Sequence, residues 1–449
     1  MELLLRNMKD TQRSEHVYTI QQQIAQVAQE RPQECFTSLN HYLDLEWLQA
    51  AYQRVQPDSA PGMDGQSWAD YGKNLSENLQ SLLNRAKSGS YVAPPVKRVH
   101  IPKGEGKETR PIGLPTIEDK VLQRAVTMLL EPIYEQDFKC FSFGFRPGRS
   151  AHAALACIWS QCMSQNIQWI LEVDIRKYFD TLKHECLRQI LDQRVRDGVV
   201  RQLIGKWLKA GVLEKGSVSY PQDGTPQGGV VSPMLSNIYL HTVLDSWYVQ
   251  SVKPRMKGRT FLARFADDFV LGFEKKEDAE KVYRVLFQRF AKYGLSLHPE
   301  KTRLVPFGCP EQARGDQPSP EIFDFLGFTH YWGKSRKGRW IIQRKTSAKR
   351  LCRSLKRVYQ WCRENRHEPM RVQAEKLGLK LKGHFGYYGI TGNARALQRF
   401  RQTVIWAWRK WLARRGDPKG MPWDRMNRLL AFFYLPEARV VHSIYAAKP

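Results

Sequence analysis

The sequence lacks several features that would assign it to particular classes of protein. No apolar run approaches the roughly 18 residues that a membrane-spanning helix needs, so no membrane partner is predicted. The apolar run at residues 3–5, near the N-terminus, is too short for a signal peptide. Eight cysteines are scattered without a CxxC pair, which argues against a zinc site, and no internal repeat is present. Together these absences predict a cytoplasmic protein with reduced thiols.

Acidic residues are scarce relative to basic ones. The 449-residue chain has 44 Asp and Glu against 71 Lys and Arg, a net charge of +27. Such an excess points to a polyanionic partner, most simply nucleic acid. Residues 333–363 contain twelve basic residues and no acid, and residues 384–420 add eight against one acid. Trp, Tyr and Phe are interleaved with both sets, which favours nucleic-acid binding over a merely solvated helix face.

The most informative stretch is residues 258–274. Two apolar, aromatic-rich runs flank an Asp pair, Asp267 and Asp268, and predict two strands of a hairpin with the acids at its turn. Two carboxylates held so close repel each other unless they share a cation, and hard oxygen ligands suit Mg²⁺. The alternative is a solvated turn, in which Asp is common.

A third acid ends another apolar run. Residues 168–174 predict a buried strand with Asp174 at its carboxyl end, where a carboxylate is costly unless it is paired or bound to metal. Asp180 is predicted to be the N-cap of a helix that begins at Thr181.

Three further segments combine turn chemistry with charge. Residues 96–103 and 109–115 predict a basic hairpin that could hold a polyphosphate between Lys103 and Arg110, although solvated surface charges are the alternative. In the loop 141–150, aromatic residues alternate with Arg146 and Arg149 before a Ser-capped helix, which suits base stacking and phosphate contact. A packed loop with exposed arginines explains that loop equally well. The Gly/Pro turn 222–233 presents Gln227 next to glycines that allow close approach of a ligand.

Taken in order, these segments resemble a reverse transcriptase. Asp174, the segment Thr225-Pro-Gln-Gly-Gly-Val-Val-Ser-Pro233 and Phe265-Ala-Asp-Asp268 carry the resemblance. More narrowly, the chain from about residue 45 onward resembles the bacterial type of the group II intron-encoded reverse transcriptase/maturase family. The additional segments that match that family are residues 60–65, 110–115, 142–149, 298–302, 325–328 and 381–390.

The resemblance implies an α+β fold, the right-hand polymerase, with fingers, a palm whose β-sheet is flanked by helices, and an α-helical thumb called maturase domain X. The expected division is residues 1–90 as an N-terminal extension, 91–170 as fingers, 171–330 as palm, and 331–449 as the basic thumb with a C-terminal tail.

The resemblance also implies roles for individual residues. Asp174, Asp267 and Asp268 would be catalytic and would hold two Mg²⁺ ions, with Mn²⁺ as a possible substitute. The residues expected to contact the dNTP are Lys103, Arg110, Phe179 (excluding a ribose 2′-hydroxyl), Gln227 and Lys301 (a proton donor to pyrophosphate). The residues expected to contact RNA are Arg146, Arg149, Arg350, Arg353, Lys382 and Arg395.

The expected function is RNA-directed DNA polymerisation on an RNA template and DNA primer, with binding of group II intron RNA and assistance to splicing and mobility. The sequence departs from the family pattern in two places that bear on this expected function. Phe265 replaces the usual Tyr, which should preserve packing and activity. No Cys/His-bearing nuclease module follows the thumb, so DNA cleavage is not expected and priming would use nicks or replication forks. The alternatives are a free-standing reverse transcriptase recruited for phage defence or DNA repair, and an RNA-binding maturase without polymerase activity.

Overall fold

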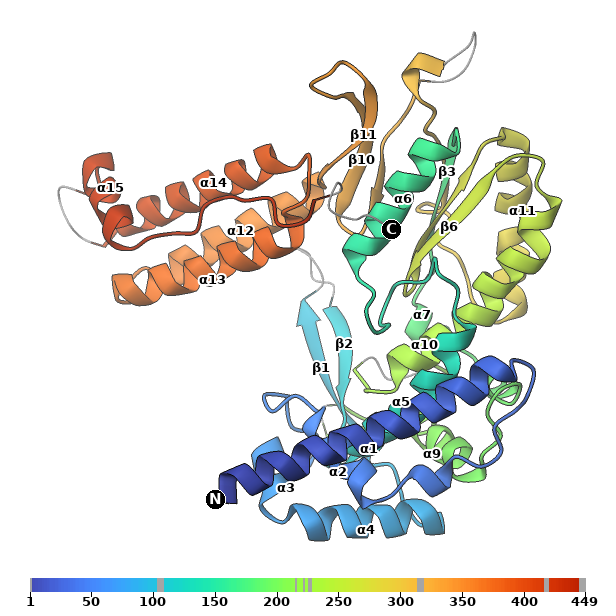
Figure 1. The fold of residues 1–449 in the computed structure, drawn as a ribbon. Coiled ribbons are helices and arrows are strands. Elements are labelled where there is room, and N and C mark those ends of the chain that lie inside the picture. Colours follow the sequence, from blue (N-terminus) through green and yellow to red (C-terminus); the bar gives the residue numbers. More distant parts are fainter. Residues whose placement is uncertain are drawn as a thin grey trace.

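The computed structural model describes residues 2–102, 109–214, 216–220, 223–224, 228–312, 319–415 and 420–443. Helices surround three β-sheets, and a separate group of C-terminal helices extends from the body (Figure 1). The structure is therefore a mixed α+β right-hand fold, as the sequence predicts. None of the helices in the described ranges combines the length and apolar character needed to cross a membrane.

The N-terminal third is a helical layer at the base of the molecule (Figure 1). The long helix α5 (Ile117–Asp137) is buried along most of its length because α1 (Glu2–Glu30) and α2 (Leu45–Gln53) cover it. The layer is completed by α3 (Trp68–Lys73) and α4 (Leu75–Ser88), which ends at Gly89 in the left-handed conformation (φ +78°) that glycine favours.

A mixed sheet with strand order β2-β1-β4-β5 stands above this layer. Strands β1 (Val96–Pro102) and β2 (Thr109–Leu114) form the predicted basic hairpin, with Ile101 opposite Arg110. The short strands β4 (Val212–Glu214) and β5 (Ser217–Ser219) extend the sheet. Lys103 lies outside the described residues.

The central sheet has the order β6-β7-β3-β8 and is antiparallel throughout. The strands are β6 (Thr260–Phe265), β7 (Asp268–Phe273), β3 (Trp169–Asp174) and β8 (Arg303–Pro306), which confirms the predicted hairpin and the predicted strand before Asp174.

Alternate residues of these strands enter two different cores. Leu171 and Phe269 join the large core that includes α11 (Lys276–Lys292), whereas Ile170 and Val270 join a second core with α6 (Ala151–Ser164). Burial on both faces explains why the strands are almost entirely apolar.

Between β3 and β6 the chain forms α7 (Tyr178–Thr181), α8 (His184–Leu191), α9 (Gly198–Leu208) and α10 (Ser232–Leu240). The predicted N-cap role of Asp180 is wrong. Asp180 lies within α7, and Lys183 precedes α8 instead. Asp180 resembles a helix start signal in the sequence, but the chain turns earlier, at Lys177, which adopts the left-handed conformation (φ +46°).

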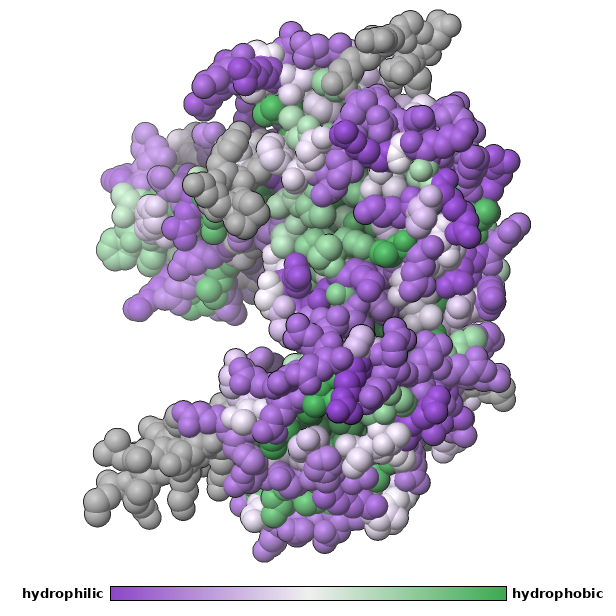
Figure 2. Space-filling view, turned by 45° about the vertical axis from the view of Figure 1, so that its right-hand side comes forward, coloured by the Kyte–Doolittle hydropathy of each residue, from purple (hydrophilic) through white to green (hydrophobic). Residues whose placement is uncertain are grey.

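The C-terminal part begins with a third sheet of order β11-β10-β9, comprising β9 (Phe323–Phe325), β10 (Phe328–Lys334) and β11 (Trp340–Thr346). Helices α12 (Ala348–Glu364), α13 (Met370–Tyr388), α14 (Ala394–Leu412) and α15 (Trp423–Phe432) then form a module with its own apolar core around Trp408. Figure 2 shows a largely hydrophilic surface that is hollowed between this module and the N-terminal layer.

Candidate active site

The three predicted acids lie together at one end of the central sheet. Asp174, the last residue of β3, stands directly opposite Asp268, the first residue of β7. Such facing residues have Cα atoms roughly 4.5–5.5 Å apart and side chains on the same face of the sheet. Asp267 precedes Asp268 in the turn between β6 and β7, after Ala266 in a left-handed conformation (φ +56°). Acids from two distant segments of the chain therefore meet at one hairpin.

A buried ion pair supports this turn from below. Arg264 on β6 and Asp245 both have fully buried side chains, and the Arg264 Nε donates to Asp245 Oδ1 at 2.8 Å. The Arg264 Nη1 also donates to the carbonyl oxygen of Ala266 at 3.2 Å and to Asn237 Oδ1 at 2.9 Å. This support could not be predicted from the sequence. Its only local signal is a lone cation within an otherwise apolar strand.

The loop 141–144 supports the same turn from the side. The Phe143 N–H donates to the Arg264 carbonyl and the Arg264 N–H donates to the Phe141 carbonyl, so the loop pairs with the edge of β6. A Cβ atom on Gly144 would lie 2.3 Å from the backbone nitrogen of Ala266. Only glycine allows the loop to approach the acid-bearing turn so closely.

The two predicted RNA-binding arginines that follow this loop lie in different environments. Arg146 is 8% exposed, pairs with Glu135 at 2.8 Å, and donates to the carbonyl oxygens of Lys139 and Ser142. These contacts favour the packed-loop interpretation, and we leave Arg146 out of the proposed RNA contacts. Arg149 is exposed, with its guanidinium 5.9 Å from the Phe143 ring centroid.

Two of the predicted cations reach the acids. The Lys301 Nζ lies 3.0 Å from Asp174 Oδ2, on a turn fixed by a hydrogen bond from the His298 N–H to the Asp174 carbonyl. Burial raises the pKa of Asp267, and the nearby guanidinium of Arg110 on β2 opposes that rise. The basic hairpin therefore lies near enough to the central sheet for Arg110 to influence one of its acids. Gln227, like Lys103, lies outside the described residues.

The electrostatics of the acids suit a shared cation. Although Asp268 retains accessible area, the protein atoms around its carboxylate raise its pKa to about 7 by desolvation, and the neighbouring Asp267 adds repulsion. Among the described side chains, no three acidic, His or Cys groups form a ready-made metal site, since Asp174 turns toward Lys301. The chemistry of the donor set, carboxylate oxygens on facing backbone positions, fits Mg²⁺.

Phe179 lies five residues past Asp174, on the short helix α7. Its side chain is 8% exposed and packs edge-to-face on Tyr178, with ring centroids 5.3 Å apart. Tyr178 in turn interacts electrostatically with Asp267 and donates a hydrogen bond to the Ser236 carbonyl. Phe179 therefore follows a residue that lies close to the acids.

The predicted RNA-binding residues of the C-terminal module lie mostly at its surface. Arg350, Lys382 and Arg395 are exposed, and Arg353 is partly buried. Arg395 borders a shallow hollow of about 570 Å³ on α14, together with Arg399 and Trp406. An exposed indole beside two guanidinium groups is a surface that can stack a base and neutralise a phosphate.

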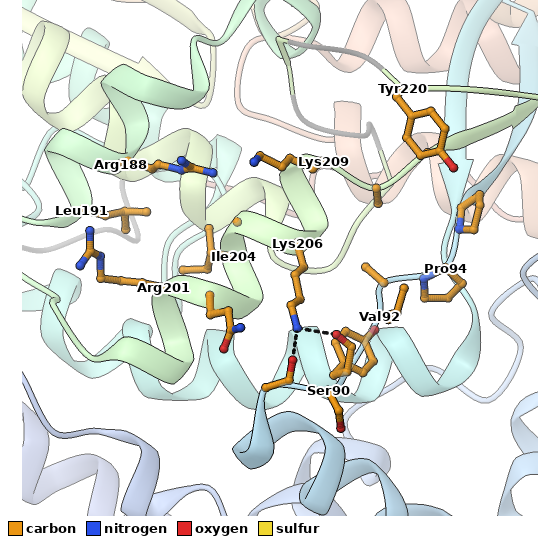
Figure 3. A pocket seen from close by; sticks show the side chains of 18 of the residues that line it. Ser90, Val92, Pro94, Arg188, Leu191, Arg201, Ile204, Lys206, Lys209 and Tyr220 are labelled. Atoms are coloured by element: carbon orange, nitrogen blue, oxygen red, sulfur yellow. Dashed lines mark hydrogen bonds between the residues drawn. The ribbon is translucent and has the colours of Figure 1, made fainter.

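A separate cavity of about 720 Å³ lies between α8, α9 and the segment before β1, away from the acids (Figure 3). Several cationic side chains border this cavity, but two of them already bind other groups of the protein. Lys206 donates to the carbonyl oxygens of Gly89 and Tyr91, and Arg201 pairs with Asp192. The cavity is thus in part a set of structural contacts between elements.

The central sheet is antiparallel and presents two acids at a hairpin turn and a third on the adjacent strand, and a basic hairpin and a helical module accompany it. This arrangement defines a template-directed polymerase of the right-hand class. Residues 101–330 match the family model described as reverse transcriptase (RNA-dependent DNA polymerase). The chain belongs to this family.

Named relatives extend the comparison. The chain is 37% identical over 257 residues to protein YkfC of Escherichia coli, an alignment that covers 50% of this chain and 67% of that protein. It is 35% identical over 299 residues to the group II intron-encoded protein LtrA of Lactococcus lactis, covering 65% of this chain and 48% of LtrA, so it spans about half the length of that relative. It is 29% identical over 214 residues to nuclear intron maturase 4 of Arabidopsis thaliana, covering 47% of this chain and 25% of that protein.

Proposed function

We propose that this protein is an RNA-directed DNA polymerase in which Asp174, Asp267 and Asp268 form the catalytic centre. The observation that carries the proposal is the register of the central sheet, which sets Asp174 opposite Asp268 within the segment that matches the reverse transcriptase family. In this reaction the primer 3′-hydroxyl attacks the α-phosphate of a dNTP and pyrophosphate leaves. Divalent ions held by the three carboxylates would stabilise negative charge on the attacking and leaving oxygens.

The other residues have distinct proposed tasks. Arg110 would bind the triphosphate, and its electrostatic effect on Asp267 supports that role. Lys301 would donate a proton to pyrophosphate, a role that its position beside Asp174 supports. Phe179 would limit the space next to the ribose, while Lys103 and Gln227 remain predictions from the family resemblance. The division into extension (1–90), fingers (91–170), palm (171–330) and thumb (331–449) is likewise part of the proposal.

A primer-extension assay tests the polymerase proposal. The full chain, an RNA template, a DNA primer, dNTPs and Mg²⁺ are combined, and product is measured for wild type, Asp267→Asn and Asp180→Asn. We expect wild-type extension, a loss of at least about 100-fold in Asp267→Asn, and near wild-type activity in Asp180→Asn. Asp180 is an exposed carboxylate on α7 and so controls for loss of charge. Robust extension by Asp267→Asn would refute the assignment.

We further propose that the protein binds a group II intron RNA through its C-terminal module and assists its splicing and mobility. Support comes from two of the relatives, a group II intron-encoded protein and an intron maturase, and from the exposed cations Arg350, Lys382 and Arg395. Splicing of an intron transcript at limiting Mg²⁺ should accelerate with wild type and with Asp267→Asn alike. The triple variant Arg350→Ala/Lys382→Ala/Arg395→Ala should lose the effect, and equal acceleration by that variant would contradict the proposal.

A further inference from the structure

Asn237 on α10 has a buried side-chain amide that the proposed reaction does not use. The residue is 1% exposed. Its Oδ1 accepts from Arg264 Nη1 at 2.9 Å, and its Nδ2 donates to the Gly144 carbonyl oxygen at 2.7 Å. A guanidinium can only donate and a carbonyl oxygen can only accept, so these partners fix which way the amide points. Asn237 therefore joins two segments that both reach the acid-bearing turn.

The first partner, Arg264, holds the turn on the carbonyl side of Ala266. The same Nη1 that donates to Asn237 also donates to the Ala266 carbonyl oxygen, at 3.2 Å. That carbonyl belongs to the peptide group that joins Ala266 to Asp267. Ala266 is left-handed (φ +56°), a conformation that a residue other than glycine keeps only when its surroundings hold it there. Because Nη1 is shared, the position of the Asn237 amide bears directly on the peptide before Asp267.

The second partner, Gly144, restrains the same residue from its amino side. A Cβ atom on Gly144 would lie 2.3 Å from the Ala266 nitrogen, so the loop 141–144 is in close contact with the turn. The hydrogen bond from Asn237 Nδ2 fixes the Gly144 peptide in this contact. Ala266 is thus enclosed between Arg264 and Gly144, and a single amide bonds both of them.

We propose that Asn237 is a positioning residue that holds the peptide before Asp267, and with it the Asp267 carboxylate, in place. It acts by bonding Arg264 and Gly144 at once. The inference rests on the polymerase function proposed above. Asp245 holds the opposite edge of the Arg264 guanidinium and leaves Nη1 for Asn237 and the turn. Loss of the amide frees Nη1 and the Gly144 carbonyl together, so the acid-bearing turn can shift. Asn237 is buried and does not contact substrate.

The competing explanation is that Asn237 only stabilises the fold, as buried and hydrogen-bonded amides do in general. Asn78 on α4, in the N-terminal helical layer, provides a control, because its Nδ2 also donates to a backbone carbonyl oxygen, that of Tyr71, at 2.9 Å. Substitution with Asp keeps the shape of either side chain and replaces the N–H donor with an oxygen. Substitution with Ser shortens the side chain and tests the same contacts without a new buried charge.

The test compares wild type, Asn237→Asp, Asn237→Ser, Asn78→Asp and Asn78→Ser as full chains. Single-turnover incorporation at saturating primer and dNTP measures the rate, fluorescence anisotropy measures template–primer affinity, and electron paramagnetic resonance measures the Mn²⁺ affinity of the primer complex. Both Asn237 variants should incorporate dNTP at least about 10-fold more slowly, as expected when a buried carbonyl loses its donor beside the reacting centre. They should also bind Mn²⁺ more weakly and keep the wild-type affinity for template–primer. The Asn78 variants should match wild type in all three measurements.

A double-mutant cycle with Gly144→Ala tests the route through the loop. If Asn237 acts through the contact between Gly144 and Ala266, the two substitutions damage the same contact. The rate loss in Asn237→Ser/Gly144→Ala should then be close to that of the more severe single variant and well below the product of the two separate losses.

Four outcomes would overturn the inference. The Asn237 variants could match wild type in both rate and Mn²⁺ affinity, they could lose only template–primer affinity, the Asn78 variants could show the same losses, or the two rate losses in the double variant could multiply. A urea titration establishes that each variant is folded, and Asn237→Ser decides alone if Asn237→Asp does not fold. Failure of both to fold would make the role of Asn237 structural and would likewise overturn the inference.

The proposed polymerase function fails separately, if wild type itself does not extend the primer. Mn²⁺ binding by the Asn237 variants would still report on the turn in that case, since it needs no chemistry.

Discussion

At the scale of single residues, burial sets the protonation of several side chains away from the acids. His330 on β10 is fully buried and stacks on Phe323, with ring centroids 4.6 Å apart. Burial, reinforced by the charge of Arg344, lowers the pKa of His330 to about 3. The folded protein therefore favours the neutral imidazole. Protonation would place a positive charge inside the second apolar core, which costs free energy.

This environment predicts acid sensitivity. Because the pKa of His330 is lowered from 6.5 in the unfolded chain, its full contribution to stability is present above pH 6.5 and is lost as the pH falls toward 3. At pH 5 the loss amounts to about 2 kcal/mol. In His330→Phe, which keeps a stacking ring, the unfolding free energy measured with urea should fall by about 2 kcal/mol less between pH 7.5 and 5.

The exposed His367→Phe controls for removal of a histidine as such. It should show the same acid sensitivity as wild type. An equal loss of stability in His330→Phe and wild type would show that His330 takes up its proton without cost in the folded state.

At the scale of elements, much of the fold could be predicted from local patterns. The apolar runs around Asp267 predict strands because both faces of the central sheet are buried, and those strands are β6 and β7. The Ser150-capped helix is also confirmed, since its hydroxyl accepts from the Ala153 N–H as the first contact of α6. Such features depend on neighbours within a few residues, which a sequence displays directly.

What could not be predicted depends on contacts between distant segments. Nothing near Gly144 indicates that it lies against Ala266, and nothing near Asn237 indicates that it reaches Gly144. The environment of Arg146 was open for the same reason, because its carboxylate partner Glu135 belongs to the preceding helix. The sequence alone predicts the three acids at their strand ends, whereas the residues that hold them there are visible only in the structure.

The close approach of Gly144 gives a prediction at this scale. A methyl group in Gly144→Ala would meet the Ala266 backbone at 2.3 Å, so the loop 141–144 or the acid-bearing turn must move. We expect primer extension to fall at least about 10-fold, since a displacement of about 1 Å at a reacting centre is costly. Steady-state extension and a thermal melt measure activity and folding in parallel.

Gly198→Ala serves as the matched control because no atom lies within 4 Å of the added methyl group. It should keep wild-type activity. Normal extension by Gly144→Ala would mean that the loop does not constrain the turn.

At the scale of the whole molecule, charge and shape act together. The surface is hollowed between the C-terminal module and the N-terminal layer, and the chain carries a net charge of +27 (Figure 2). The C-terminal module contributes cations without a matching number of acids, and several of its aromatic side chains are exposed, including Trp406 and Trp423. This combination favours an RNA partner held by its phosphates and by stacked bases.

The affinity for RNA should therefore depend steeply on salt. Each phosphate neutralised contributes a slope of about −0.7 to −0.9 in log K against log salt concentration. Filter binding of a structured RNA between low and physiological salt should give a steep negative slope, made shallower by about one unit per cation removed from Arg350, Lys382 and Arg395. A flat response would contradict an electrostatic interface.

The central claim is that Asp174, Asp267 and Asp268 together hold divalent ions at the end of the central sheet. It is tested most directly by anomalous X-ray scattering from crystals of the protein with RNA template, DNA primer, a dNTP and Mn²⁺. The account predicts Mn²⁺ density in contact with carboxylate oxygens of all three residues. Mn²⁺ bound elsewhere, with these carboxylates left without ions, would contradict it.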